Sequence, residues 1–238
     1  MDKTLIEKRF FNSLVLYDKN AIVQKIMADK LIDYIEVFKR FNKIFEIGCG
    51  TGTLTKKIIK KIDFKTLIAN DIVDCKKYVC IDERVNFIKG DCEYIQFPSN
   101  NNLVISNATF QWINDYKKMF EKIFQSLDDN GILAFTTFGP ENFIELREIG
   151  MPSINYYTIE EIESFFYEMF DIIDIKENKI IIRFNSYKEL FNHIKATGVN
   201  AIKYNKNEVL PNLLKYYRLE KETTLTYHPL YFILRAKK

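Results

Sequence analysis

The chain has 238 residues, of which 47% are hydrophobic, and its formal net charge is +3 at pH 7. This composition provides a large apolar core and excludes wholesale disorder, while the small charge gives no indication of nucleic-acid binding. Four Cys without a C-x-x-C pair, together with two His, leave little for a disulfide framework or a metal site. No stretch approaches the roughly 20 apolar residues of a membrane span, and the charged N-terminal segment is unlike a signal peptide. We therefore expect a cytoplasmic protein with no membrane partner.

The first 140 residues alternate between apolar strand patterns and helical patterns. Two helical segments come first, at about residues 2–14 and 20–40. The predicted strands that follow are residues 43–49, 65–71, 84–91, 102–108 and 131–139. The clearest of the intervening helices is 115–127, where apolar residues recur at helical spacing. This strand–helix alternation predicts a parallel, doubly wound α/β sheet.

The pattern changes after residue 150. A helix at 158–169 leads to a β-rich run at 170–184, followed by helical segments at about 186–197 and 206–219 and a last strand at 229–237. No repeat or flexible linker divides the chain, so we interpret residues 1–238 as one domain. Residues 1–42 form covering helices, 43–150 a cofactor-binding core, and 151–238 the rest of the sheet with a helical insertion at about 186–219.

A glycine-rich turn follows the first predicted strand, in "KIFEIGCGTGTLTKKI" (43–58). Its glycines stand at every second position: Gly48, Gly50 and Gly52. A dinucleotide fingerprint would require glycine at residue 53, which is Thr. The acidic Glu46, two residues before the first glycine, suits a ligand that carries a cation near the turn. S-adenosylmethionine has a sulfonium and an ammonium group and no phosphate, which favours it over NAD.

Two further acidic residues follow the next strands. Asp71 stands 19 residues after Gly52, where a carboxylate can accept both ribose hydroxyls. Asp91 can accept a hydrogen bond from an adenine amino group, and the main-chain N–H of Cys92 can donate to a ring nitrogen. Each acid alone could be a strand-end cap or a turn residue. Together with the glycine turn, they occupy three successive strand ends, which favours an S-adenosylmethionine site.

Five segments give the chain a family resemblance. They are "YDKNAIVQ" (17–24), "NLVISNATFQWINDY" (102–116), "TTFGPENFIELRE" (136–148), "HIKATGVNA" (193–201) and "LTYHPLYFILRAK" (225–237). The chain resembles class I methyltransferases and, within them, the malonyl-[acyl-carrier protein] methyltransferases of biotin synthesis. The first two segments also resemble other small-molecule methyltransferases. Another small-acid carboxyl methyltransferase and an inactive cofactor-binding module therefore remain alternatives.

The resemblance implies a Rossmann-like, seven-stranded, mostly parallel sheet with N-terminal helices and a helical lid in the C-terminal third. It implies methylation of the free carboxylate of a malonyl thioester to a methyl ester, with S-adenosylmethionine as methyl donor. The expected partner of a monomeric enzyme is acyl carrier protein bearing malonyl, with malonyl-coenzyme A as the other possible substrate. A carboxylate is already ionised at pH 7, so no strong base is required.

The resemblance also implies roles for single residues. Tyr17 would cover the methionine end of the cofactor, and Asn107 would line its reactive end. Ile72 would contact the ribose edge, and Cys49 and Cys92 would contribute their main chains. Trp112 and His228 are candidates for the catalytic site, with a core residue and a structural histidine as the respective alternatives.

Arg147 is predicted to hold the malonyl carboxylate. On a helix over residues 141–149, Arg147 falls between Phe143 and Ile144 on the apolar side, while three glutamates lie opposite. An arginine in such a position needs an anionic partner. The alternatives are a structural ion pair and a side chain that reaches water with its head group.

Overall fold

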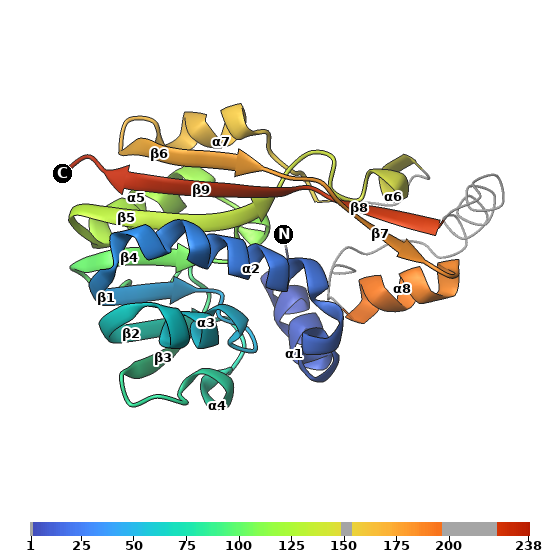
Figure 1. The fold of residues 1–238 in the computed structure, drawn as a ribbon, viewed down its shortest axis with the longest axis horizontal. Helices are drawn as coiled ribbons and strands as arrows, with labels where there is room; N and C mark the ends of the chain where they lie inside the picture. The colour runs from blue at the N-terminus through green and yellow to red at the C-terminus, as the bar shows by residue number, and fades with distance from the viewer. Residues whose placement is uncertain (1, 149–153, 197–222) are drawn as a thin grey trace.

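The computed structural model describes residues 2–148, 154–196 and 223–238, without the side chains of residues 13, 15–18, 195 and 196. Its centre is a sheet with the strand order β3-β2-β1-β4-β5-β9-β6 (Figure 1). The strands are β1 (Arg40–Ile47), β2 (Asp63–Asp71), β3 (Val85–Lys89), β4 (Asn101–Ser106), β5 (Leu127–Phe138), β6 (Phe170–Glu177) and β9 (Pro229–Ala236). Only β9 runs antiparallel to its neighbours, β5 and β6. The predicted seven-stranded, mostly parallel sheet is confirmed.

Helices cover both faces of the sheet. One face carries α2 (Ile22–Ile35) and α3 (Thr53–Lys61), whose Leu31 and Ile58 are completely buried in a core shared with β2. The other carries α5 (Tyr116–Ser126) and α7 (Ile159–Phe166), where Phe120 and Phe166 pack around Phe135 of β5. Burial on both sides explains why the strands are nearly continuous apolar runs. The carboxyl ends of β1 to β5 are left as one open edge.

The second strand is followed by a very short helix, α4 (Lys76–Val79). The N-terminal helix α1 (Lys3–Asn20) is longer than expected and lies beyond the carboxyl ends of the strands (Figure 1). Among the described residues, no helix is long and apolar enough to cross a membrane.

A two-stranded arm extends from β6 and β9. The predicted β-rich run at 170–184 is interrupted after Glu177, and its second part, β7 (Ile180–Phe184), pairs antiparallel with β8 (Thr223–Tyr227). The arm carries α8 (Tyr187–Ala196), which packs against α1 (Figure 1). The predicted helix at 206–219, and with it most of the predicted insertion, lies outside the described residues.

The helix that carries Arg147 begins later than predicted. Residues 140–143 form a turn, and α6 covers only Ile144–Glu148. Phe143 has a φ of 56°, and its N–H donates to the carbonyl of Thr226 in β8 (2.7 Å). Glu145, predicted on the exposed side, is instead buried and accepts hydrogen bonds from the N–H (3.0 Å) and Oγ1 (2.5 Å) of Thr226. Tertiary hydrogen bonds to β8 thus override the helical pattern.

Candidate functional site

The glycine turn folds back over the end of β2. The N–H groups of Gly48 and Cys49 both donate to the carbonyl of Asn70, at 2.8 and 2.9 Å. The three glycines have φ values of 73°, 52° and 78°, a left-handed region that disfavours residues with a Cβ. A Cβ on Gly48 would lie 2.1 Å from Thr109 Oγ1, whereas a Cβ on Gly50 would meet no atom within 4 Å. Gly48 is therefore required by packing, and Gly50 borders open space.

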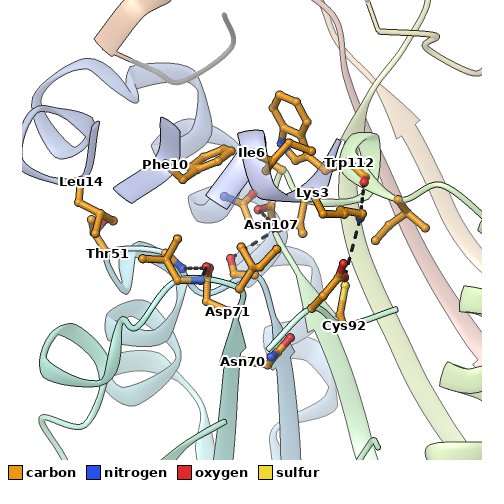
Figure 2. Close-up of a pocket in the computed structure, with 18 residues that line it drawn as sticks. Lys3, Ile6, Phe10, Leu14, Thr51, Asn70, Asp71, Cys92, Asn107 and Trp112 are labelled. Atoms are coloured by element: carbon orange, nitrogen blue, oxygen red, sulfur yellow. Dashed lines mark hydrogen bonds and ion pairs between the residues drawn. The ribbon is translucent and has the colours of Figure 1, made fainter. Parts of the chain in front are cut away.

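That space is a pocket at the carboxyl ends of the strands. Such crevices are the usual ligand sites of open α/β sheets. Figure 2 shows Asp71, Asn70 and Cys92 on the strand side of the cavity and α1 opposite them.

Asp71 connects the glycine turn to the end of β2. Its Oδ2 accepts from the N–H of Gly50 (2.8 Å), and its Oδ1 accepts from the N–H of Val73 (2.9 Å). Burial raises the pKa of this carboxyl, although the backbone hydrogen bonds oppose that shift. Each carboxylate oxygen can accept a second hydrogen bond, so Asp71 can still receive ribose hydroxyls. Because a carboxylate occupies the Gly50 N–H, the turn is poorly suited to a phosphate.

Asp91 presents an unpaired oxygen at the same cavity. Its Oδ1 accepts from the N–H of Glu93 (3.0 Å) and lies 3.8 Å from Lys3 Nζ, while its buried Oδ2 has no partner in the described part of the chain. A buried acceptor without a partner is costly, so a donor from a ligand would stabilise it. An adenine amino group would be such a donor. The two acids and the open space beside Gly50 therefore fit S-adenosylmethionine.

The roof of the cavity comes from α1, where the sequence predicted a covering helix but not the individual lining residues. Ile6, Phe10 and Leu14 extend from one side of the helix toward the cavity (Figure 2). Phe10 packs edge-on against Trp112, with a ring-centroid distance of 5.6 Å. Lys3 pairs with Glu93 and donates to the carbonyl of Trp112 (2.8 Å). The i, i+4 apolar spacing over residues 6–14 was the available signal for this covering face.

Glu46 lies behind the glycine turn and does not line the cavity. Its Oε2 accepts from Thr55 Oγ1 (2.7 Å), and its Oε1 is buried without a partner in the described structure. Burial raises the pKa of Glu46 from 4.5 to about 7; the Thr55 hydrogen bond opposes this shift and the nearby Asp71 charge adds to it. In this position Glu46 supports the turn.

The structure brings most of the predicted cofactor residues together. Those that line the cavity are Gly48, Gly50, Asp71, Ile72, Asp91, Cys92, Asn107 and Trp112. Cys49 and Gly52 are in the turn but do not line the cavity, and Gly52 is the N-cap of α3. Tyr17 is on α1, with its side chain outside the described part. Among the described residues, no group of three or more His, Cys, Asp or Glu is placed to hold a metal ion.

A second, smaller cavity adjoins the first, and Phe10, Ala108 and Trp112 line both. Its polar lining consists of uncharged side chains: Gln24, Gln111, Asn142 and Tyr156. Asn107 stands at the junction, where its Nδ2 donates to the main-chain carbonyl of Gln24 (3.0 Å) and its Oδ1 accepts from Thr136 Oγ1 (2.8 Å). No charged side chain is among the described residues that line this second cavity.

Arg147 and His228 line neither cavity. Arg147 is half-buried, and its guanidinium donates to the carbonyl of Pro140. His228 is buried at the β8–β9 junction; its Nδ1 accepts from the N–H of Glu141 (3.2 Å), and its Nε2 lies 3.0 Å from Glu177 Oε2. Both positions favour the structural alternatives, and the predicted substrate and catalytic roles of these two residues remain predictions.

Comparisons with known proteins agree with this geometry. A family model described as a methyltransferase domain matches residues 45–135. A malonyl-[acyl-carrier protein] O-methyltransferase from Calditerrivibrio nitroreducens is 36% identical, and the match covers 98% of each chain. The chain belongs to the malonyl-[acyl-carrier protein] O-methyltransferase family.

A second member of the family, from Chlorobium phaeovibrioides, is 33% identical over 100% of this chain and 98% of that protein. Among solved structures, the N-methyltransferase NodS from Bradyrhizobium japonicum, in complex with S-adenosyl-L-homocysteine, has a TM-score of 0.55 at 12% identity. That match covers 89% of this chain and 86% of NodS, and it reflects a shared fold. The protein is therefore a methyltransferase, as the sequence predicted.

Two glycine substitutions should separate folding from binding. Gly48→Ala should lower the free energy of unfolding by about 2–4 kcal/mol, because it adds a severe clash with Thr109 to a left-handed backbone. Gly50→Ala should cost only about 1 kcal/mol in stability but weaken binding of S-adenosylhomocysteine, since its methyl group enters the cavity. Urea unfolding and calorimetric titration measure the two effects. Equal loss of stability in both variants would contradict this assignment.

Proposed function

We propose that the protein transfers a methyl group from S-adenosylmethionine to the free carboxylate of malonyl-acyl carrier protein, forming the methyl ester early in biotin synthesis. The observation that carries this proposal is the pair of adjoining cavities. One has the carboxylates and open glycine turn that fit the cofactor, and the other is a chamber beside it whose described side chains are uncharged. The names of the family members supply the malonyl group and its carrier.

When bound, S-adenosylmethionine supplies an electrophilic methyl group on a positively charged sulfur. An ionised carboxylate needs no general base. The residues of the chain therefore have to bind and orient the two substrates and to exclude water. Asp71 and Asp91 orient the nucleoside, and the side chains of α1 cover it. Trp112 and Phe10 lie where the two cavities meet and limit the access of water to that region.

The test is a substrate panel with radiolabelled S-adenosylmethionine. The protein is incubated with malonyl-, succinyl- and acetyl-acyl carrier protein and with malonyl-coenzyme A. We expect base-labile label on malonyl-acyl carrier protein and none on the acetyl form, which has no free carboxylate. Preferential labelling of malonyl-coenzyme A would show that coenzyme A, and not acyl carrier protein, carries the malonyl group. Absence of label on every malonyl thioester would refute the proposed substrate.

A further inference from the structure

The second cavity is lined by a buried amide whose oxygen has no partner among the described residues. Gln24 is only 6% exposed, and it lines this cavity from α2. Its Oε1 makes no hydrogen bond within the described part of the chain. The two ends of a side-chain amide are exchanged by a rotation of its last torsion, so either the oxygen or the NH₂ group can face the cavity. Leaving such a group unsatisfied is costly in the free protein, which indicates that a ligand completes it.

The other polar side chains of the chamber are already engaged. Gln111 donates through Nε2 to the carbonyl of Ala108 (2.6 Å), and Asn142 donates through Nδ2 to the hydroxyl of Tyr156 (2.9 Å). Asn142 also accepts through Oδ1 from the N–H of His228 (3.3 Å). These bonds fix the walls of the chamber. Gln24 is thus the amide available to recognise an incoming group.

We propose that Gln24 is the ligand of the acceptor carboxylate and that the described walls of the chamber bind this anion without a cationic side chain. The inference rests on the function proposed above and names the group that holds its substrate. The Gln24 NH₂ donates to one carboxylate oxygen, which directs the other oxygen toward the junction of the two cavities at Trp112. The acyl group beyond the carboxylate packs against the apolar walls, among them Phe138, Phe143 and Ile154.

The chemistry gives a reason for an uncharged chamber. A lone pair of the carboxylate oxygen forms the new C–O bond, the methyl carbon–sulfur bond breaks, and its electron pair stays on sulfur. No proton is transferred. One positive and one negative charge become a neutral ester and a neutral thioether, so charge disappears along the reaction coordinate.

A charged residue beside such a reaction affects the energies of the ground state and of the transition state by different amounts. A guanidinium would stabilise the carboxylate before reaction more than the transition state, in which the negative charge is already reduced, and would thereby raise the barrier. A neutral amide orients the carboxylate at a smaller cost. The positive sulfur is then the main counter-charge of the carboxylate in the chamber. Arg147, outside both cavities, is consistent with this arrangement.

The experiment compares Gln24→Met with Gln24→Glu. Methionine retains the approximate shape of glutamine without its hydrogen bond, and glutamate places a second acid in the chamber. Gln24→Met should lower kcat/KM for malonyl-acyl carrier protein by about 10- to 100-fold, the effect of one hydrogen bond to a charged group. Gln24→Glu should lower it further. Gln125→Met, at an exposed glutamine of α5, is the matched control and should keep wild-type kinetics.

Two binding measurements and one stability measurement exclude a merely structural role. Gln24→Met should bind S-adenosylhomocysteine as the wild type does, and it should bind malonyl-acyl carrier protein more weakly in the presence of that product. Its melting temperature should equal or exceed that of the wild type, because an unsatisfied buried amide has been removed. A lower melting temperature together with weaker S-adenosylhomocysteine binding would overturn the proposal.

Arg147→Met tests the alternative in which Arg147 holds the acceptor carboxylate. We expect its kcat/KM to stay within a few-fold of wild type, whereas a carboxylate held by Arg147 requires a loss of about 100-fold. Normal kinetics in Gln24→Met with loss in Arg147→Met would assign the carboxylate to Arg147. If the wild type methylates succinyl-acyl carrier protein and not the malonyl form, the proposed substrate fails and the same variants are compared on the succinyl form. If it methylates no carboxylate, both proposals fail.

Discussion

Replacing Asp71 by Ala is expected to weaken the binding of S-adenosylhomocysteine by about 10- to 100-fold. The carboxylate has two tasks, since it orders the glycine turn through Gly50 and remains able to accept the ribose hydroxyls. Losing charged acceptors costs roughly 1–3 kcal/mol of binding free energy. Isothermal titration calorimetry with S-adenosylhomocysteine measures the effect, and titration with NAD should show no tight binding in either protein.

The matched control is Asp63→Ala at the other end of β2. Asp63 is exposed, and its only role in the described structure is a surface ion pair with Arg40 (3.4 Å). Such pairs contribute little, so binding should be unaffected. Unchanged S-adenosylhomocysteine affinity in Asp71→Ala, with the protein still folded, would remove Asp71 from the cofactor site.

The buried Glu46 should make stability depend on pH. Its pKa is about 7 in the folded chain and 4.5 when solvated, so between these values the folded state binds more protons than the unfolded state. The free energy of unfolding therefore falls as pH rises through this window. Glu46→Gln keeps an acceptor for Thr55 without a charge. It should gain about 3 kcal/mol relative to wild type between pH 5 and pH 8.

Urea unfolding of both proteins at pH 5, 6.5 and 8 measures this difference. The pKa of Asp71 is also raised by burial, and it adds a contribution of the same sign to both proteins, which the comparison removes. Glu36→Gln, at an exposed glutamate, should show the pH profile of the wild type. Parallel profiles for wild type and Glu46→Gln would show that Glu46 is ionised at little cost, through solvent access or an unrecognised partner.

The sequence predicted the parallel sheet and its order of elements because buried strands leave a strong apolar signal. The cofactor residues followed from topology, since the carboxyl ends of parallel strands converge at one edge. Asp71 and Asp91 were found in this way, and the structure places both at the cavity. Glu46 could not be placed so simply, because strand alternation does not say how deeply a carboxylate is buried behind a turn.

The residues around the proposed site of the methyl acceptor were harder to predict from the sequence. Arg147 was assigned from a helical pattern that Phe143 interrupts with a left-handed backbone, a property that no periodicity reveals. Gln24 was passed over because a single glutamine in an amphipathic helix gives no chemical signal. Only packing shows that its amide oxygen is buried beside a cavity without a partner among the described residues. The structure places His228, in the motif "LTYHPL", at the junction of β8 and β9, and its catalytic role remains a prediction.

Phe10 belongs to both cavities and to one helix, α1, which forms no part of the sheet. A displacement of α1 therefore changes the walls of both chambers in a single event. Exchange of the spent cofactor and exchange of the acyl group are then not independent steps. If both ligands leave only when α1 moves, they share a common gate, and the dissociation rate of each would depend on whether the other is bound.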